Sequence, residues 1–153
     1  MNVNEINQSL LQGDIERQEL FPHLETLHRS PFVFEVDFGL AELPEQPGVI
    51  LIRGARQYGK STWLEGELRR TIETHGPGSA LYLNGDEIAH AADLLATIRA
   101  LVPAFATTTR VRRLFIDEIT AVDGWERALK RALDAGELRD VLVVTTGSRA
   151  TDL

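Results

Sequence analysis

Residues 54–61 read GARQYGKS and fit the pattern GxxxxGK followed by Ser or Thr, which is typical of a phosphate-binding loop, or P-loop. Gly54 and Gly59 suit this loop because glycine turns tightly enough for several backbone N–H groups to surround a phosphate chain. Lys60 is predicted to reach the β- and γ-phosphates, and Ser61 to offer its hydroxyl to Mg²⁺. The predicted phosphate-binding residues are Gly54, Ala55, Arg56, Gln57, Tyr58, Gly59, Lys60, Ser61 and Thr62.

The segments on either side of this loop have the order that a P-loop requires. Residues 49–52 read VILI and predict a short buried strand that enters the loop. Residues 60–75 predict a helix that leaves it, with the positive end of its dipole toward the phosphates. A glycine-rich turn with an incidental lysine is the alternative, and the strand-loop-helix order argues against it.

A second motif lies at residues 113–118, which read RLFIDE, an apolar strand that ends in two adjacent carboxylates. This is the form of a Walker B element, in which an aspartate supports the metal and a neighbouring glutamate activates the attacking water. Asp117 is therefore the predicted metal residue together with Ser61, and Glu118 the predicted catalytic residue together with Lys60. An acidic turn in solvent is the alternative, which the pairing with a P-loop disfavours.

A third apolar run, residues 141–148, reads VLVVTTGS and predicts another buried strand. Because parallel strands finish at the same edge of a sheet, its terminal hydroxyls are expected near the nucleotide. Thr146 or Ser148 is predicted to hydrogen-bond the γ-phosphate or the attacking water, the task called sensor 1. A threonine-rich strand end that satisfies its own turn remains the alternative.

The composition fits one globular domain inside a cell. The chain has 153 residues, 43% of them apolar, and no cysteine, which excludes disulfides and thiolate chemistry. It has neither a membrane-spanning apolar run nor a signal sequence at its N-terminus, so a cytoplasmic location is expected. The formal charge of −7 disfavours a dedicated nucleic-acid surface, although arginines gather at 69–70 and 110–113.

Strand-like and helix-like segments alternate along the chain, which predicts a parallel sheet covered by helices, a three-layer α/β/α fold. Residues 4–29 predict one or two helices and residues 32–38 a half-exposed strand, so residues 1–47 form a leading segment and 48–153 the P-loop core. Within that core, residues 80–83 predict a strand and residues 89–101 a helix.

Taken in order, these motifs resemble a family of prokaryotic AAA-type ATPases that carry a C-terminal domain of unknown function. The resemblance covers residues 48–149 and rests on GARQYGKST, LYLNGDE, LFIDEI, GWERALKRALDAG and VVTTGS. It implies that Lys60 and Ser61 bind nucleotide and metal, Asp117 supports the metal, Glu118 activates water and Thr146 senses the phosphate. It also makes Trp125 a structural anchor. Tyr58 departs from the family, which more often has a small aliphatic residue there.

The resemblance also implies an architecture and partners. It implies a central P-loop strand, separated from the Walker B strand by the sensor strand. Related ATPases continue into a fifth strand, a helical lid and a C-terminal domain, so this core is expected to be incomplete. An arginine finger, worth about 10³ to 10⁵ in rate, is expected from a second copy or a partner protein, and its absence predicts weak turnover.

Several functions compete at this point. The leading hypothesis is an ATP-binding and Mg²⁺-dependent ATP-hydrolysing module that couples ATP or ADP binding to a partner or an attached domain. A nucleotide-dependent regulatory switch with little hydrolysis is the main alternative. A small-molecule or nucleoside kinase is less favoured, because a glutamate directly after the Walker B aspartate suits water activation. A GTPase is disfavoured because the guanine-reading sequence Asn-Lys-x-Asp is absent. No membrane partner is expected, and a nucleic-acid partner is possible but is not supported by the sequence.

Overall fold

A computed structural model of the chain describes residues 2–16, 42–53 and 59–148. The predicted strand at 32–38, the second part of the predicted N-terminal helical region and P-loop residues 54–58 lie outside the described residues.

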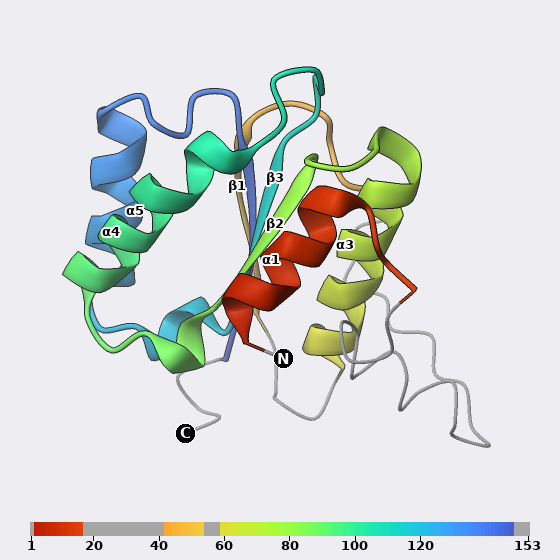
Figure 1. Cartoon of the computed structure of the whole chain (residues 1–153). Helices are drawn as coiled ribbons and strands as arrows, with labels where there is room; N and C mark the ends of the chain where they lie inside the picture. The colour runs from red at the N-terminus through yellow and green to blue at the C-terminus, as the bar shows by residue number, and fades with distance from the viewer. Residues whose placement is uncertain (1, 17–41, 54–58, 149–153) are drawn as a thin grey trace.

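Among the described residues, four parallel strands form one sheet in the order β1-β4-β3-β2 (Figure 1). The strands are β1 (Gly48–Arg53), β2 (Ala80–Asn84), β3 (Arg113–Asp117) and β4 (Leu142–Gly147). The register pairs Ile52 with Thr146 and Asn84 with Asp117, so the carboxyl ends of all four strands meet at one edge of the sheet. The predicted parallel α/β sheet is therefore confirmed, as is the position of the sensor strand between the P-loop and Walker B strands.

The prediction that the P-loop strand is central is wrong for the described sheet, because β1 is its outer strand. Every residue of β4 is buried, whereas Val49 of β1 is 42% exposed. The β1 strand contains four consecutive apolar residues, and β4 contains three with a fourth, Val141, directly before it, so the two sequences are similar. Pairing partners, which the local sequence does not encode, decide which of the two is enclosed.

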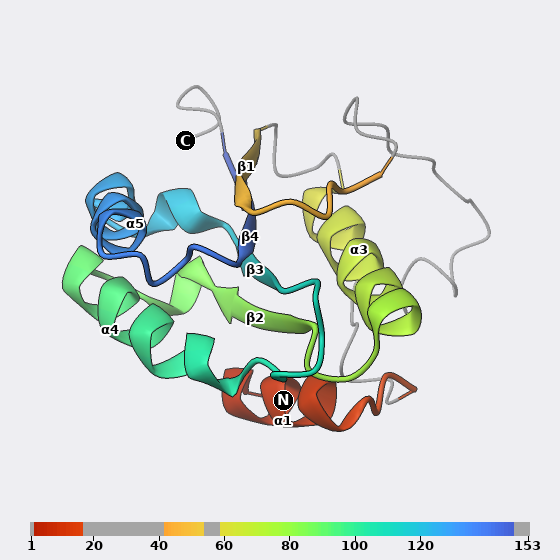
Figure 2. The ribbon, with the colours of Figure 1, turned by 90° about the horizontal axis from the view of Figure 1, so that it is seen from above.

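Helices cover the two faces of the sheet (Figure 2). The helix α3 (Lys60–His75) packs on one face through Leu64, Leu68 and Ile72, at the four-residue spacing of a helical stripe. On the other face lie α4 (Ala91–Leu101) and α5 (Trp125–Asp134). The described loops include three short 3₁₀ turns, η3 (Gly85–Glu87), η4 (Val102–Ala104) and η5 (Ile119–Ala121).

Side chains along β3 alternate between the two faces of the sheet, so this strand contributes to both cores. Leu114 and Ile116 belong to the core under α4 and α5, and Phe115 belongs to the core under α3. By the same period of two, Arg113 and Asp117 share the α3 face with Phe115. The strand therefore delivers its aspartate toward the start of α3.

The helix α1 (Val3–Gln12) lies along the outer edge of β2 (Figures 1 and 2). The Asn7 side chain, which is 5% exposed, donates from Nδ2 to the carbonyl of Tyr82 at 2.8 Å. Its Oδ1 accepts from the backbone N–H of Tyr82 at 2.7 Å. One side-chain amide thus replaces the two hydrogen bonds that another strand would make, and it covers part of this edge.

Replacing Asn7 with alanine is expected to lower the free energy of unfolding by about 1–3 kcal/mol, because both buried backbone groups of Tyr82 lose their partner. Urea unfolding followed by circular dichroism measures this change. The neighbouring variant Gln8→Ala is the matched control, because Gln8 is exposed on the same helix. Equal stabilities of the two variants would contradict the edge-covering role.

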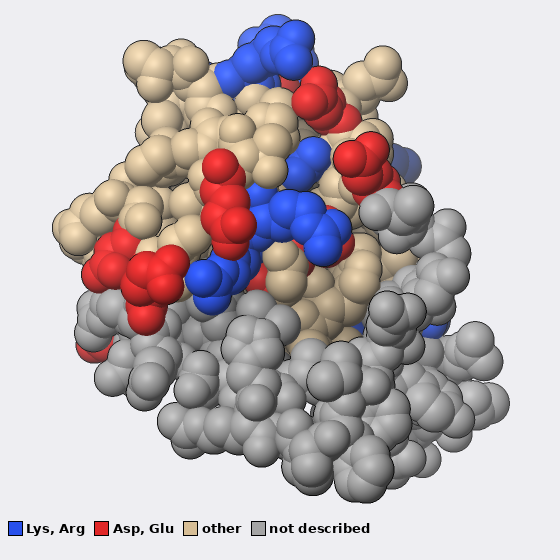
Figure 3. Space-filling view, turned by 90° about the vertical axis from the view of Figure 1, so that its right-hand side faces the viewer, with Lys and Arg blue, Asp and Glu red and all other residues tan. Residues whose placement is uncertain are grey.

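Ion pairs cross the outer surface of α3. Arg69 pairs with Glu73 at 2.8 Å and with Glu16 at 3.3 Å, and Arg70 pairs with Glu67 at 2.8 Å. Figure 3 shows basic and acidic side chains intermixed on the described part of this face. The arginines at 69–70 are thus neutralised locally and do not form a single-sign patch that would suit nucleic acid. Among the described helices, none is long and apolar enough to cross a membrane.

Candidate nucleotide-binding site

The candidate site lies where α3 begins beside the carboxyl ends of β3 and β4. It is called the strand-end site below and consists of Lys60, Ser61, Asp117, Glu118, Thr146 and Ser148. Ligands of open parallel α/β sheets bind at this edge because the loops leave the strands there.

The start of α3 is shaped by Gly59, whose φ of 74° and ψ of 24° are left-handed. This conformation strains any residue with a Cβ, so glycine at this position has a structural reason. Gly59 has no side chain to cap the helix, and the first intrahelical bond runs from the N–H of Trp63 to its carbonyl at 2.9 Å. A helix N-terminus without a side-chain cap suits an anionic ligand.

Lys60 is the first residue of α3 and is only 3% exposed. Its Nζ donates to the carbonyl oxygen of Gly147, the last residue of β4, at 3.1 Å. This contact fixes a buried positive charge between the helix and the sensor strand. Burial strengthens the attraction of such a charge for an anion, because the local dielectric is low.

Asp117 joins the P-loop helix to the sensor strand. Its Oδ2 accepts a hydrogen bond from Ser61 Oγ at 2.8 Å, and its Oδ1 accepts one from Thr146 Oγ1 at 2.6 Å. Thr146 is fully buried. Three residues that the sequence singled out separately therefore form one contiguous group.

The oxygen donors of Ser61 and Asp117 suit Mg²⁺, which prefers hard oxygen ligands. In the described part of the chain, no group of three or more His, Cys, Asp or Glu side chains can hold a metal. That agrees with the usual mode of Mg²⁺ in nucleotide sites, where one or two carboxylates are combined with water and substrate phosphates. The residues present therefore fit Mg²⁺ bound together with a nucleotide.

Glu118, the residue directly after β3, has an unusual backbone conformation. With φ of 50° and ψ of 51°, it is the one non-glycine residue with positive φ in the described ranges. Its backbone N–H donates to Thr146 Oγ1 at 2.9 Å. Its side-chain Oε1 accepts from Ser148 Oγ at 2.7 Å and from Thr120 Oγ1 at 3.3 Å. The carboxylates of Asp117 and Glu118 therefore accept from different hydroxyls, while Thr146 contacts both residues because it also accepts from the Glu118 backbone.

Two residues of this arrangement were not predicted from the sequence. Thr120 lies in η5, donates to Glu118 and accepts from the backbone N–H of Ser148 at 3.1 Å. Gly85 follows β2, and a Cβ at that position would collide with the carbonyl oxygen of Glu118. The LYLNGDE segment contains this glycine, but its contact partner lies 33 positions away in sequence, so the local pattern gives no signal.

Tyr82 is a further polar group close to the site. Burial raises the pKa of its phenol, and the carboxylates of Asp117 and Glu65 raise it further. Tyr82 therefore stays protonated and neutral near Asp117. Its ring contributes to the core between α3 and the sheet.

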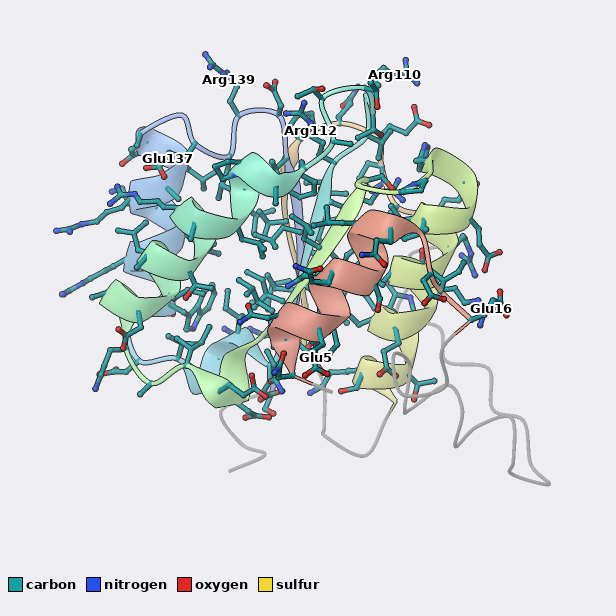
Figure 4. All side chains as sticks on the ribbon, in the orientation of Figure 1. Glu5, Glu16, Arg110, Arg112, Glu137 and Arg139 are labelled. Carbon is teal, nitrogen blue, oxygen red and sulfur yellow. The ribbon has the colours of Figure 1, made fainter. Side chains whose placement is uncertain are left out.

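The arginines at 110–113 lie at the opposite end of the strands. Arg113 begins β3 and is buried, where it donates to Thr71 Oγ1 at 2.9 Å. Arg110 pairs with Glu45 at 3.1 Å, and Figure 4 shows Arg110, Arg112 and Arg139 at this far end. None of these side chains is placed to contact a nucleotide at the strand-end site.

The structure thus brings together Lys60, Ser61, Asp117, Glu118 and Thr146 at one end of the sheet. Thr62 lies in the first turn of α3, and residues 54–58 lie outside the described residues. Contact between Thr146 and a phosphate stays a prediction, since its hydroxyl donates to Asp117. Trp125 begins α5 and packs against the core under α4 and α5, as expected of a structural anchor.

A parallel α/β sheet with a helix that begins at GKS defines a domain of the P-loop nucleotide-binding class. The model of the AAA domain family matches residues 46–153, which is more than half of the chain. The chain therefore belongs to that family and is a nucleotide-binding AAA-type ATPase module. Among curated proteins, no sequence matches it.

Proposed function

We propose that this protein binds ATP and hydrolyses it with Mg²⁺, and that it couples the nucleotide state to a partner or an attached domain. The observation that carries the proposal is the group formed by Ser61, Asp117 and Thr146, with contacts of 2.8 and 2.6 Å. A hydroxyl at the start of α3 and a carboxylate at the end of β3 meet where both can serve one metal-nucleotide complex.

The nucleotide is bound by charge and by backbone dipoles. Lys60 supplies a buried positive charge to the phosphates, and the uncapped start of α3 supplies N–H groups. Ser61 and Asp117 would hold Mg²⁺, which neutralises part of the charge on the phosphates when it is bound. Thr146 fixes the Asp117 carboxylate by donating to its Oδ1.

Glu118 is the proposed general base. Its carboxylate accepts two hydroxyl hydrogen bonds at Oε1, and no hydrogen bond to Oε2 occurs among the described residues. Oε2 is thus the oxygen that accepts the proton of the attacking water. The water oxygen then bonds to the γ-phosphorus, and the bond from that phosphorus to the bridging oxygen of ADP breaks.

The experiment that tests the proposal is a titration of the purified chain with ATP, ADP and GTP, with and without Mg²⁺. Calorimetry follows binding, and a single-turnover assay with excess protein follows phosphate release. Mg²⁺-dependent ATP binding with phosphate release would support the proposal. Binding without release would support the regulatory switch, and absence of binding would overturn both functions.

A second copy or a partner protein is proposed to supply an arginine to the phosphates. In that case the rate of phosphate release per chain rises with protein concentration, or on addition of the partner. A rate per chain that is independent of concentration would argue against a second copy as the source.

The turn at Glu118 depends on close approach by Gly85. Gly85→Ala is expected to displace the Glu118 backbone, to lower stability by about 1–3 kcal/mol and to slow phosphate release. Urea unfolding and the single-turnover assay measure the two effects. Gly136→Ala is the control, because it strains a left-handed glycine (φ of 75°) in open space beyond α5. It should lower stability without slowing release, and a Gly85→Ala variant with the rate of the native chain would contradict the argument.

A further inference from the structure

The end of β4 and the residue directly after it contact Glu118 and its neighbour Thr120. Thr146 accepts from the Glu118 N–H, Gly147 packs against Thr120, and Ser148 donates to the Glu118 carboxylate. Each of these contacts bridges about 30 positions of sequence. The glutamate is therefore held at its backbone and at its side chain by one short segment.

The two hydrogen bonds that Glu118 Oε1 accepts differ in length and therefore in strength. Ser148 Oγ lies 2.7 Å from Oε1, which is the usual distance for a hydrogen bond between a hydroxyl and an oxygen. Thr120 Oγ1 lies 3.3 Å from the same oxygen, which is long for such a bond. Ser148 is only 8% exposed, so little water competes for its hydroxyl. Ser148 is therefore the principal anchor of the carboxylate, and Thr120 supports it.

We infer that Ser148 is a positioning residue for the Glu118 carboxylate in ATP hydrolysis, an inference that rests on the proposed function. Ser148 holds the carboxylate by Oε1 and so leaves Oε2 to the attacking water. It acts through Glu118 and needs no contact with nucleotide. This differs from the sequence prediction, in which Ser148 was an alternative to Thr146 for hydrogen-bonding the γ-phosphate or the water.

A positioning role has a kinetic signature of its own. A general base that is misplaced by about 1 Å can lose 10²-fold in rate while the nucleotide still binds. Ser148→Ala is thus expected to lower kcat by about 10- to 100-fold. KM and the affinity for ATP should stay within about twofold, because the residues that bind the phosphates are untouched.

The test measures kcat, KM and ATP affinity for the native chain and for Ser148→Ala, alone and combined with Glu118→Gln. In the Glu118→Gln background the serine should have no further effect on kcat, since both residues act in one step. Ser79→Ala is the matched control, because Ser79 is a buried serine at the opposite end of the sheet that donates to the carbonyl of Gly76 at 2.6 Å. It should change stability and leave kcat unchanged.

If Ser148→Ala fails to fold, Ser148→Cys replaces it, because a thiol has similar size and donates only weakly. A kcat within about twofold of the native value, or a parallel loss of ATP affinity, would overturn the positioning role alone. A native chain that binds ATP and releases no phosphate would overturn the proposed hydrolysis, and the positioning role with it.

Discussion

Replacing Lys60 with alanine is expected to weaken ATP binding by about 100-fold, which corresponds to about 2.7 kcal/mol. Lys60 is nearly fully buried at the start of α3, and its ammonium group is fixed against the end of β4 at 3.1 Å from the Gly147 carbonyl oxygen. In this low-dielectric position the ammonium group contributes charge-assisted hydrogen bonds to phosphate, each worth about 1.5–3 kcal/mol. Calorimetric titration with Mg²⁺ and ATP measures the loss.

The chain offers a matched control for this variant. Its second lysine, Lys130, is exposed on α5, away from the strand-end site. Lys130→Ala should bind ATP with native affinity, and thermal unfolding of both variants separates lost binding from lost folding. Native affinity in a folded Lys60→Ala variant would show that the phosphates lie elsewhere.

Replacing Glu118 with glutamine is expected to lower kcat for ATP hydrolysis by about 10²- to 10⁴-fold, the range that general acid-base catalysis contributes. The glutamine oxygen can still accept from Ser148, so the side chain keeps its orientation while it loses its basicity. ATP affinity should be unchanged or slightly tighter. Single-turnover phosphate release together with calorimetry measures both quantities.

Glu126→Gln is the control for this substitution, because Glu126 is an exposed glutamate in the first turn of α5. It removes the same charge from the chain and should leave kcat unchanged. A Glu118→Gln variant that releases phosphate at the native rate would refute the role of Glu118 as general base and would leave the binding role of Lys60 intact.

The two substitutions test ATP binding and ATP hydrolysis separately. Lys60→Ala acts on the affinity for ATP, and Glu118→Gln acts on the rate after ATP has bound. A Glu118→Gln variant that binds ATP without hydrolysing it would stay in the ATP-bound state. Under the proposed function, such a variant is also a suitable reagent for capturing a partner that binds the ATP-bound state.

Local patterns predicted much of this fold. The apolar runs at 49–52, 80–83 and 114–116 lie within strands, and the run at 141–144 does so from Leu142 onward, because a continuous apolar run bounded by turn residues favours a buried strand. The helix at 60–75 followed from its loop and its glycine boundary at residue 76. The edge position of β1 was not predicted, because a strand's neighbours depend on contacts far away in the sequence.

The same distinction applies to the site. Lys60, Ser61, Asp117, Glu118 and Thr146 were identified from the sequence because their chemistry is coded in short motifs at strand and helix ends. Their mutual contacts, such as that between Ser61 and Asp117 across 56 positions, depend on strand order and register. The contacts made by Asn7, Gly85 and Thr120 were not predicted, because each of these residues is ordinary in its own segment. Ser148 was predicted as a candidate to bind the γ-phosphate or the attacking water, and its contact with Glu118 was not predicted.

The sequence by itself determined which chemical groups this protein has at its strand ends and which segments become helix or strand. Spacing and periodicity act over a few residues, so these features are readable along the chain. The tertiary structure alone decided that β1 is the outer strand of the described sheet, that Asn7 covers the edge of β2 and that Ser148 anchors Glu118. These are contacts between distant segments, and their energy depends on distances that exist only once the sheet has assembled.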